Sequence, residues 1–143
     1  MKTLEFTAFG TPKAQPRVRA CRRGNHASVY DPGTADAWKE SVRSAARTNW
    51  NGIMFANPVH ASFTLWLPRP KSHRRLNGDL KDGAPIAPTG RPDVDNFAKA
   101  IMDALTTLGL WPDDSYVVGL FVHKRYTIGV PCATIQIREY KEE

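Results

Sequence analysis

The sequence predicts a small single domain of the α/β (α+β) class, with two main helices packed on a mixed β-sheet in the order β-α-β-α-β-β. Three observations favour this class. The chain has 143 residues, which is room for one domain over residues 1–143. Hydrophobic residues make up 41% and charged residues 24%, as in an ordinary globular protein. Segments with strand-like alternation are interleaved with segments of helical periodicity, an order typical of helices packed on a sheet.

The N-terminal half predicts one strand, one long loop and one helix. Apolar and polar residues alternate over residues 3–9, so this stretch is expected to be a half-buried strand. Residues 10–33 hold three prolines and three glycines and predict a long loop, with a short hairpin near residues 28–30. Thr34 can cap a helix that runs to about Trp50. The apolar stripe of this helix consists of Trp38, Val42, Ala45 and Ala46.

The C-terminal half predicts three more strands and a second helix. The expected elements are a strand over 59–67, a loop over 68–92, a helix over 96–108 and strands over 116–126 and 132–139. Pro58 and Pro68 bound the first of these strands, and Gly109 ends the helix. The last two strands are joined through Gly129-Val130-Pro131, so they are expected to pair as a hairpin.

The net charge of +6 is unevenly distributed along the chain. Two segments are basic and contain no acid, whereas residues 93–114 hold five aspartates and one base. This distribution favours a polyanion such as DNA as the partner, together with a cation site. The candidate DNA-binding residues are Lys13, Arg17, Arg19, Arg22 and Arg23 in the first segment, and Arg69, Lys71, Arg74 and Arg75 in the second.

Composition excludes several other classes of protein. No run of about 20 apolar residues exists, so no membrane span is expected. The N-terminus lacks the apolar core of a signal peptide, which predicts a cytoplasmic protein. Cys21 and Cys132 do not form a CxxC pair, so neither a zinc ribbon nor a thioredoxin-type redox site is expected.

The candidate site begins with two aspartates, Asp93 and Asp95, just before the second helix. Pro92 biases Arg91 towards an extended conformation, and in extended chain residues two apart point to the same side. Both carboxylates can therefore face one site. The alternative is purely structural, because Asp95 or Asn96 is also a good N-cap for the helix.

On a helical wheel, Lys99 lies on the same face as Asp95, opposite the apolar stripe of the helix. Asp103 falls one turn further and is expected to pair with Lys99 at i,i+4. Asp113 and Asp114 follow the helix, and the spacing alone leaves open whether the chain brings Asp114 back to the first pair. The apolar stripe consists of Phe97, Ile101, Ala104, Leu105 and Leu108.

Hard oxygen donors without clustered histidines or cysteines suit Mg²⁺ or Mn²⁺ rather than zinc. Such an ion can polarise a phosphodiester and generate hydroxide from bound water. A lysine beside it, here Lys99, can hold the phosphate or stabilise developing negative charge.

The stretch from Arg91 to Leu105, followed by Leu110 to Val118, closely resembles the RusA family of Holliday junction resolvases. The shared pattern is D-x-D-N, a lysine four positions after the second aspartate, D-A-L, a tryptophan, and a D-D pair before a strand. Members of this family are small Mg²⁺-dependent endodeoxyribonucleases of bacteria and their phages. Pro12 to Arg19 also looks like the proline- and base-rich loop that follows the first strand in many members.

The resemblance implies specific roles. Asp93, Asp95 and Asp114 match the catalytic, metal-binding carboxylates, and Lys99 matches the catalytic lysine. It also implies a homodimer that binds branched DNA and cuts four-way junctions by paired symmetric nicks in recombination and repair. A two-fold dimer suits a substrate that itself has two-fold symmetry.

Two other functions stay open. One is a catalytically inactive DNA-binding protein of the same fold. The four intact site residues argue against it, because an idle site has no reason to hold three like charges together. The other is a nucleotide-sugar transferase of the D-x-D type, which the basic segments and the short chain disfavour.

Overall fold

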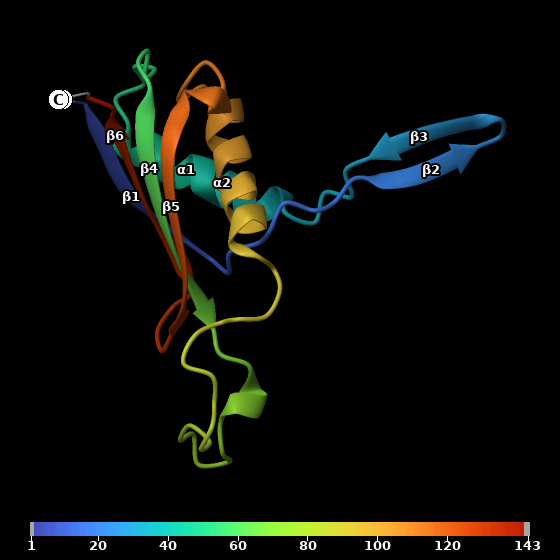
Figure 1. Cartoon of the computed structure of the whole chain (residues 1–143), viewed down its shortest axis with the longest axis vertical. Helices are drawn as coiled ribbons and strands as arrows, with labels where there is room; N and C mark the ends of the chain where they lie inside the picture. The colour runs from blue at the N-terminus through green and yellow to red at the C-terminus, as the bar shows by residue number, and fades with distance from the viewer. Residues whose placement is uncertain (1, 142–143) are drawn as a thin grey trace.

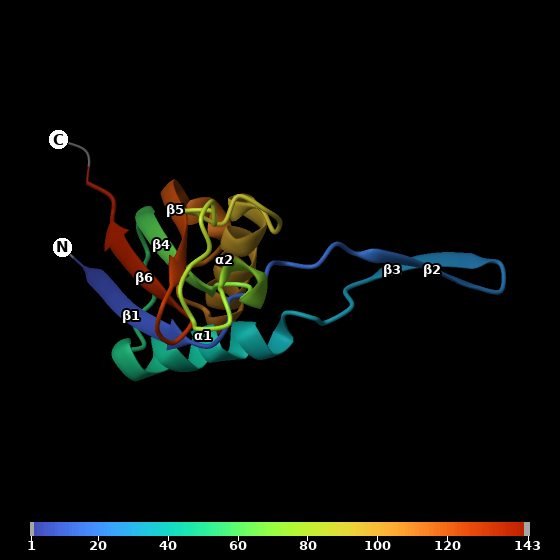
Figure 2. The same cartoon turned by 90° about the horizontal axis from the view of Figure 1, so that it is seen from below.

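The computed structural model describes residues 2–141 and confirms the predicted class and the predicted order of the main elements. Helices α1 and α2 cover one face of a four-stranded sheet, as the two views in Figures 1 and 2 show. The elements are β1 (Thr3–Phe9), β2 (Arg19–Arg23), β3 (His26–Tyr30), α1 (Asp36–Asn49), β4 (Val59–Pro68), the 3₁₀ turn η1 (Lys71–His73), α2 (Val94–Leu108), the 3₁₀ turn η2 (Asp114–Tyr116), β5 (Val117–Thr127) and β6 (Cys132–Glu139).

The sheet has the strand order β1-β6-β4-β5. Strand β6 runs antiparallel to both of its neighbours, whereas β4 and β5 are parallel. The predicted hairpin between the last two strands is therefore wrong, because β4 lies between them. In the middle of the sheet, Ala133, Ile135 and Ile137 of β6 are buried on the helix-covered face. A position beside β5 at the edge of the sheet would leave them more exposed.

The core lies between the sheet and the two helices. Alternate residues of β1, β4 and β6 point to the helices, as the alternation predicts, and the matching side of α2 is fully apolar. Phe97, Ile101 and Leu105 of α2 are each at most 2% exposed. The core holds α2 rigidly against the sheet, with its polar side facing outwards.

The helix ends differ slightly from the prediction. Ala35, not Thr34, is the N-cap of α1. Helix α2 begins at Val94, so its N-cap is Asp93 rather than Asp95 or Asn96. Gly109 ends α2 as predicted: it adopts a left-handed conformation (φ 89°), and its backbone N–H donates to the carbonyl oxygens of Leu105 and Thr106.

Residues 19–30 form a two-stranded antiparallel ribbon, made of β2 and β3, which projects away from the helices and the sheet (Figure 1). The sequence predicts a short hairpin near residues 28–30; a hairpin does form, but it is longer and residues 28–30 belong to its second strand. The sequence predicts a loop where β2 forms, because the run of arginines shows no apolar alternation. The strands are joined by Gly24-Asn25, and Gly24 has the positive φ (59°) that such a tight turn favours.

Among residues 2–141, no helix is both long and apolar enough to cross a membrane.

Candidate active site at the start of helix α2

The two aspartates of the D-x-D motif lie at the N-terminal end of α2. Asp93 is the N-cap, in an extended conformation (φ −73°, ψ 157°), and Asp95 lies in the first turn. Both side chains are exposed. The side chain of Asp93 makes no capping hydrogen bond to α2, so the structural alternative, an ordinary N-cap, does not occupy this carboxylate. The positive end of the helix dipole favours negative charge at both positions.

A hollow beside Asp93 is lined by basic residues as well. Arg17 and Arg91 share it with Asp93 and Asn96. The chain leading to Arg17 is fixed there, because the backbone N–H of Gln15 donates to the carbonyl oxygen of Asn96 (2.9 Å). Sequence reasoning missed Arg91 as a candidate ligand for DNA, although its place two residues before Asp93 was a usable signal.

Lys124 supports the chain that enters this site. Its Nζ donates to the carbonyl oxygens of Gly90 and Pro92, at 2.9 Å each. Pro92 immediately precedes Asp93 and Gly90 lies three residues before it, so Lys124 of β5 holds the backbone that leads to the aspartate. Nothing in the sequence pointed to this contact, because about 30 residues separate the partners.

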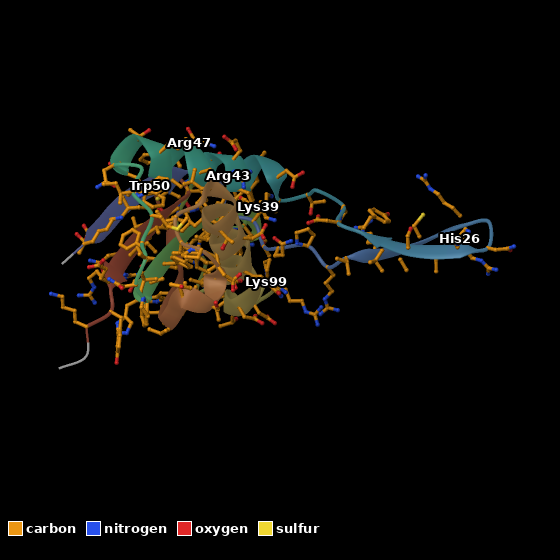
Figure 3. All side chains as sticks on the ribbon, turned by 90° about the horizontal axis from the view of Figure 1, so that it is seen from above. His26, Lys39, Arg43, Arg47, Trp50 and Lys99 are labelled. Atoms are coloured by element: carbon orange, nitrogen blue, oxygen red, sulfur yellow. The ribbon has the colours of Figure 1, made fainter. Side chains whose placement is uncertain are left out.

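Lys99 lies on the exposed side of α2, one turn after Asp95. Figure 3 shows it on α2, and Lys39 on the neighbouring α1. The predicted pair between Lys99 and Asp103 is wrong, because Asp103 accepts a hydrogen bond from Nζ of Lys39 (2.8 Å). No ion pair of Lys99 occurs within residues 2–141, which leaves its ammonium group able to contact a phosphate.

Lys39 is the buried charged residue of α1, with a side chain 7% exposed, while that of Asp103 is 49% exposed. Close by, Nη1 of Arg43 donates to the hydroxyl oxygen of Thr107 (2.9 Å). These two contacts tie α1 to the outer side of α2. Sequence reasoning missed Lys39, because a lysine next to the apolar stripe looks like an ordinary surface residue.

The two aspartates of the D-D pair differ in their hydrogen bonding. Asp113 is the N-cap of η2, and hydrogen bonding from Ser115, first from its side chain and then from its backbone N–H (3.2 Å), lowers the pKa of Asp113. Asp114 is exposed, and within residues 2–141 its carboxylate has no hydrogen-bond partner. Asp114 is thus the carboxylate of the pair that remains for a ligand.

The return of Asp114 to Asp93 and Asp95, which the spacing left open, does not occur within one chain. The 15 residues of α2 span roughly 22 Å, at about 1.5 Å per residue. Because β5 is parallel to β4, it starts where α2 ends, so Asp114 lies at that end. Accordingly, no group of three metal-ligating side chains of the His, Cys, Asp or Glu type occurs in the described part of the chain.

The basic residues of the first segment are exposed, both beside the candidate site and along the ribbon. Lys13 and Arg17 lie on the stretch that leads past Asp93, whereas Arg19, Arg22 and Arg23 belong to the ribbon. Within residues 2–141, most of these side chains form no hydrogen bond or ion pair. One exception is Arg22, whose Nε donates to the carbonyl oxygen of Gly24 (3.3 Å).

The second basic segment partly stabilises its own loop. The guanidinium group of Arg69 lies 4.4 Å from the ring centroid of Tyr126. Arg74 donates to the carbonyl oxygen of Gly78 (2.8 Å). Arg75 forms an ion pair with Asp82 on the surface, and the side chain of Lys71 is exposed. The loop leaves the C-terminal end of β4, the same end of the sheet at which α2 begins.

Comparison with known proteins shows the family of the chain. Residues 10–138 match the family model described as Endodeoxyribonuclease RusA. A relative, named Uncharacterized protein YqaN from Bacillus subtilis (strain 168), is 33% identical over 141 residues. The match covers 97% of this chain and 98% of that relative.

Proposed function

Because the chain belongs to the RusA endodeoxyribonuclease family, we propose that it resolves four-way DNA junctions by paired symmetric nicks, with Mg²⁺ as cofactor and Mn²⁺ as a substitute. The observation that carries this proposal is the pair of exposed carboxylates, Asp93 and Asp95, beside a hollow that also holds Arg17 and Arg91. Carboxylates suit a hard cation and guanidinium groups suit phosphates. The setting would be recombination and repair in the cytoplasm of a bacterium, with a phage as a further source.

The residues present fit a divalent cation of this kind. Asp93 and Asp95 offer hard oxygen donors, and the Asp93 carboxylate is not engaged in capping α2. Asp114 from a second copy of the chain would be the third ligand. When bound, the ion would polarise the scissile phosphodiester and supply a hydroxide nucleophile at neutral pH.

The residues of the chain would do the positioning around that group. Arg17 and Arg91 would bind phosphates on either side of the cut, and Lys99 would stabilise negative charge developing on the scissile phosphate. Lys124 would keep the backbone before Asp93 in place through its two carbonyl contacts.

A homodimer would complete the site. One chain carries Asp93 and Asp95 at one end of α2 and Asp114 beyond the other, so two chains related by a two-fold axis can each supply what the other lacks. Strand β5 has one unpaired edge in the sheet, and Val118, Leu120 and Phe121 are each 46–61% exposed on it. Exposed apolar residues beside an open edge are typical of an interface between chains.

The proposed activity is tested with a synthetic four-way junction beside a linear duplex of the same sequence. We expect cleavage of the junction alone, only with Mg²⁺ or Mn²⁺, and none by an Asp93→Asn variant. Binding of the junction without cleavage in any metal would favour the inactive DNA-binding protein instead. Equal cleavage of junction and duplex would contradict structure selectivity.

Replacing Lys99 should slow the chemical step and leave the fold intact. The side chain is exposed and alanine is the better helix former, so the Tm of Lys99→Ala should equal or slightly exceed that of the parent. Loss of a group that stabilises transition-state charge should lower the single-turnover cleavage rate by about 100-fold. Lys141→Ala removes another exposed lysine and is the control. An unchanged rate, or an unfolded Lys99→Ala variant, would refute the assigned role.

Replacing Arg17 and Arg19 should make DNA binding less sensitive to salt. Each phosphate contact contributes about −0.9 to the slope of log affinity against log salt, so losing two should flatten that slope by about 1.8. The measurement is a binding titration in chelator at several salt concentrations. The variant Arg47→Ala/Arg138→Ala removes the same charge from α1 and β6 and should keep the parent slope. If Arg17→Ala/Arg19→Ala also keeps it, the segment does not contact DNA.

A further inference from the structure

We propose that the ribbon of β2 and β3 lies in the major groove of the DNA arm that carries the scissile phosphate. This inference rests on the proposed function, and it adds which part of the DNA the ribbon contacts and through which face.

The ribbon does not contribute to the core of the protein. None of its residues is buried, and Cys21 alone in its two strands is even half-buried. A two-stranded ribbon on its own is marginally stable in water. A surface that holds the ribbon is therefore expected to come from a binding partner.

The two faces of the ribbon differ in chemistry. Residues paired across antiparallel strands share a face, and the pairs are Arg19 with Tyr30, Cys21 with Ser28, and Arg23 with His26. This face carries two arginines, a histidine and an aromatic hydroxyl, groups that can form hydrogen bonds with base edges, and it is the face that we place against the DNA. The opposite face carries Ala20, Arg22, Ala27 and Val29.

The charge of the ribbon favours DNA over a second copy of the chain. No acidic residue occurs between Lys13 and Tyr30, while five lysines and arginines do. The second copy in the proposed dimer is assigned to the open edge of β5, which leaves the ribbon available for DNA. Strands lie about 4.8 Å apart, so the ribbon and its side chains fit the major groove, which is about 12 Å wide.

The base of the ribbon is fixed at the candidate active site. The segment that leads into β2 contains Gln15, whose backbone N–H donates to the carbonyl oxygen of Asn96 of α2. Nε2 of Gln15 also donates to the carboxylate of Asp31 (3.2 Å), which follows β3, so the two segments that connect the ribbon to the rest of the protein are joined. Figure 3 shows His26 near the far end of the ribbon, well away from Lys99.

This placement sets the reach of the ribbon along the DNA. From Val18 to Gly24 the chain extends about 20 Å, at about 3.3 Å per residue. At 3.4 Å per base pair, the ribbon would cover about six base pairs next to the scissile phosphate.

Limited digestion with trypsin in chelator tests whether DNA covers the ribbon. Free protein should be cut after Arg19, Arg22 and Arg23, and a four-way junction should suppress these cuts at least about tenfold. Cuts that persist on DNA-bound protein would overturn the inference while leaving the proposed function intact. Failure of the protein to bind any DNA would overturn both. If trypsin cuts the ribbon of the free protein less as the protein concentration rises, the partner of the ribbon is a second copy of the chain. That result would also overturn the inference.

Methylation of guanine at N7, an atom in the major groove, tests whether the ribbon lies in that groove. Within about six base pairs of the nick, methylated guanines should weaken binding of the unmodified protein about fivefold or more, and netropsin in the minor groove should not. The variant Arg19→Ala/Arg23→Ala should lose this sensitivity, whereas Arg47→Ala/Arg138→Ala should keep it. Equal sensitivity in both variants, or inhibition by netropsin instead, would overturn the proposal.

Discussion

Mixing Asp93→Asn protomers with Asp114→Asn protomers should restore nicking of a four-way junction that each variant alone has lost. Each single variant should cleave at least about 100-fold more slowly than the parent, because even outer partners of a metal site contribute 10- to 100-fold. The two aspartates lie at opposite ends of α2. In a mixed dimer, therefore, one of the two composite sites would be intact and the other would carry both substitutions.

The rate of nicking, followed on a labelled junction, should recover to about one quarter of the parent value in an equal mixture, since half the dimers are mixed and each has one working site. The product should be a nicked junction rather than two resolved duplexes. Each variant should still bind the junction in chelator as tightly as the parent or more tightly, because a negative charge beside the phosphates is removed.

The matched control is a mixture of Asp93→Asn with Asp95→Asn. These two positions share one end of α2, so no intact site can form and activity should stay lost. Sedimentation would establish that mixed dimers are present. Mixed dimers without recovery in the Asp93→Asn and Asp114→Asn mixture would contradict a composite site, and full activity of Asp114→Asn alone would exclude this residue as a ligand.

Removing the carboxylate of Asp103 should lower the stability of the fold rather than impair the chemical step. The ammonium group of Lys39 is buried, and Asp103 is its partner at 2.8 Å. Breaking this pair leaves a buried charge uncompensated, so Asp103→Ala should lower the free energy of unfolding by about 2 kcal/mol. For a chain of this size, that corresponds to a fall in Tm of about 6–10 °C.

A second substitution separates the charge effect from simple loss of packing. The variant Lys39→Met/Asp103→Ala removes both partners and should recover most of the lost Tm, because replacing a buried ion pair by apolar groups is often nearly neutral. Glu40→Gln, which breaks exposed pairs with Arg43 and Arg47, should change the Tm far less. No difference between Asp103→Ala and Glu40→Gln would show that the buried ammonium group needs no partner.

Local patterns predicted most of the elements, because those elements depend on neighbours in the chain. The alternation over residues 3–9 and 59–67 and the apolar stripe of α2 report directly which side of each element is buried. The D-x-D motif and Lys99 were likewise found because their spacing along one helix places them together. These patterns depend only on neighbouring residues, so they can be recognised without knowing how the strands pair.

Contacts between distant segments could not be predicted in this way. The pairing of β6 with β4 rather than β5 depends on which strands bury the most apolar surface, and adjacent strands joined by a short turn suggest a hairpin instead. The partners Lys39 and Asp103 are 64 residues apart, and Lys124 contacts Gly90 across 34. The place of Asp114 was open for the same reason, since it follows from the parallel pairing of β5 with β4.

The strand order has a consequence for how the protein is made. Strand β6 comes after every other strand in the chain, yet it pairs with β1 on one side and β4 on the other, with Thr3 opposite Arg138. Until β6 has left the ribosome, β1 has no neighbour in the sheet and β4 keeps an open edge. Completion of the sheet is therefore expected to wait for β6, and until then the open edges of β1 and β4 would make the nascent chain prone to aggregation.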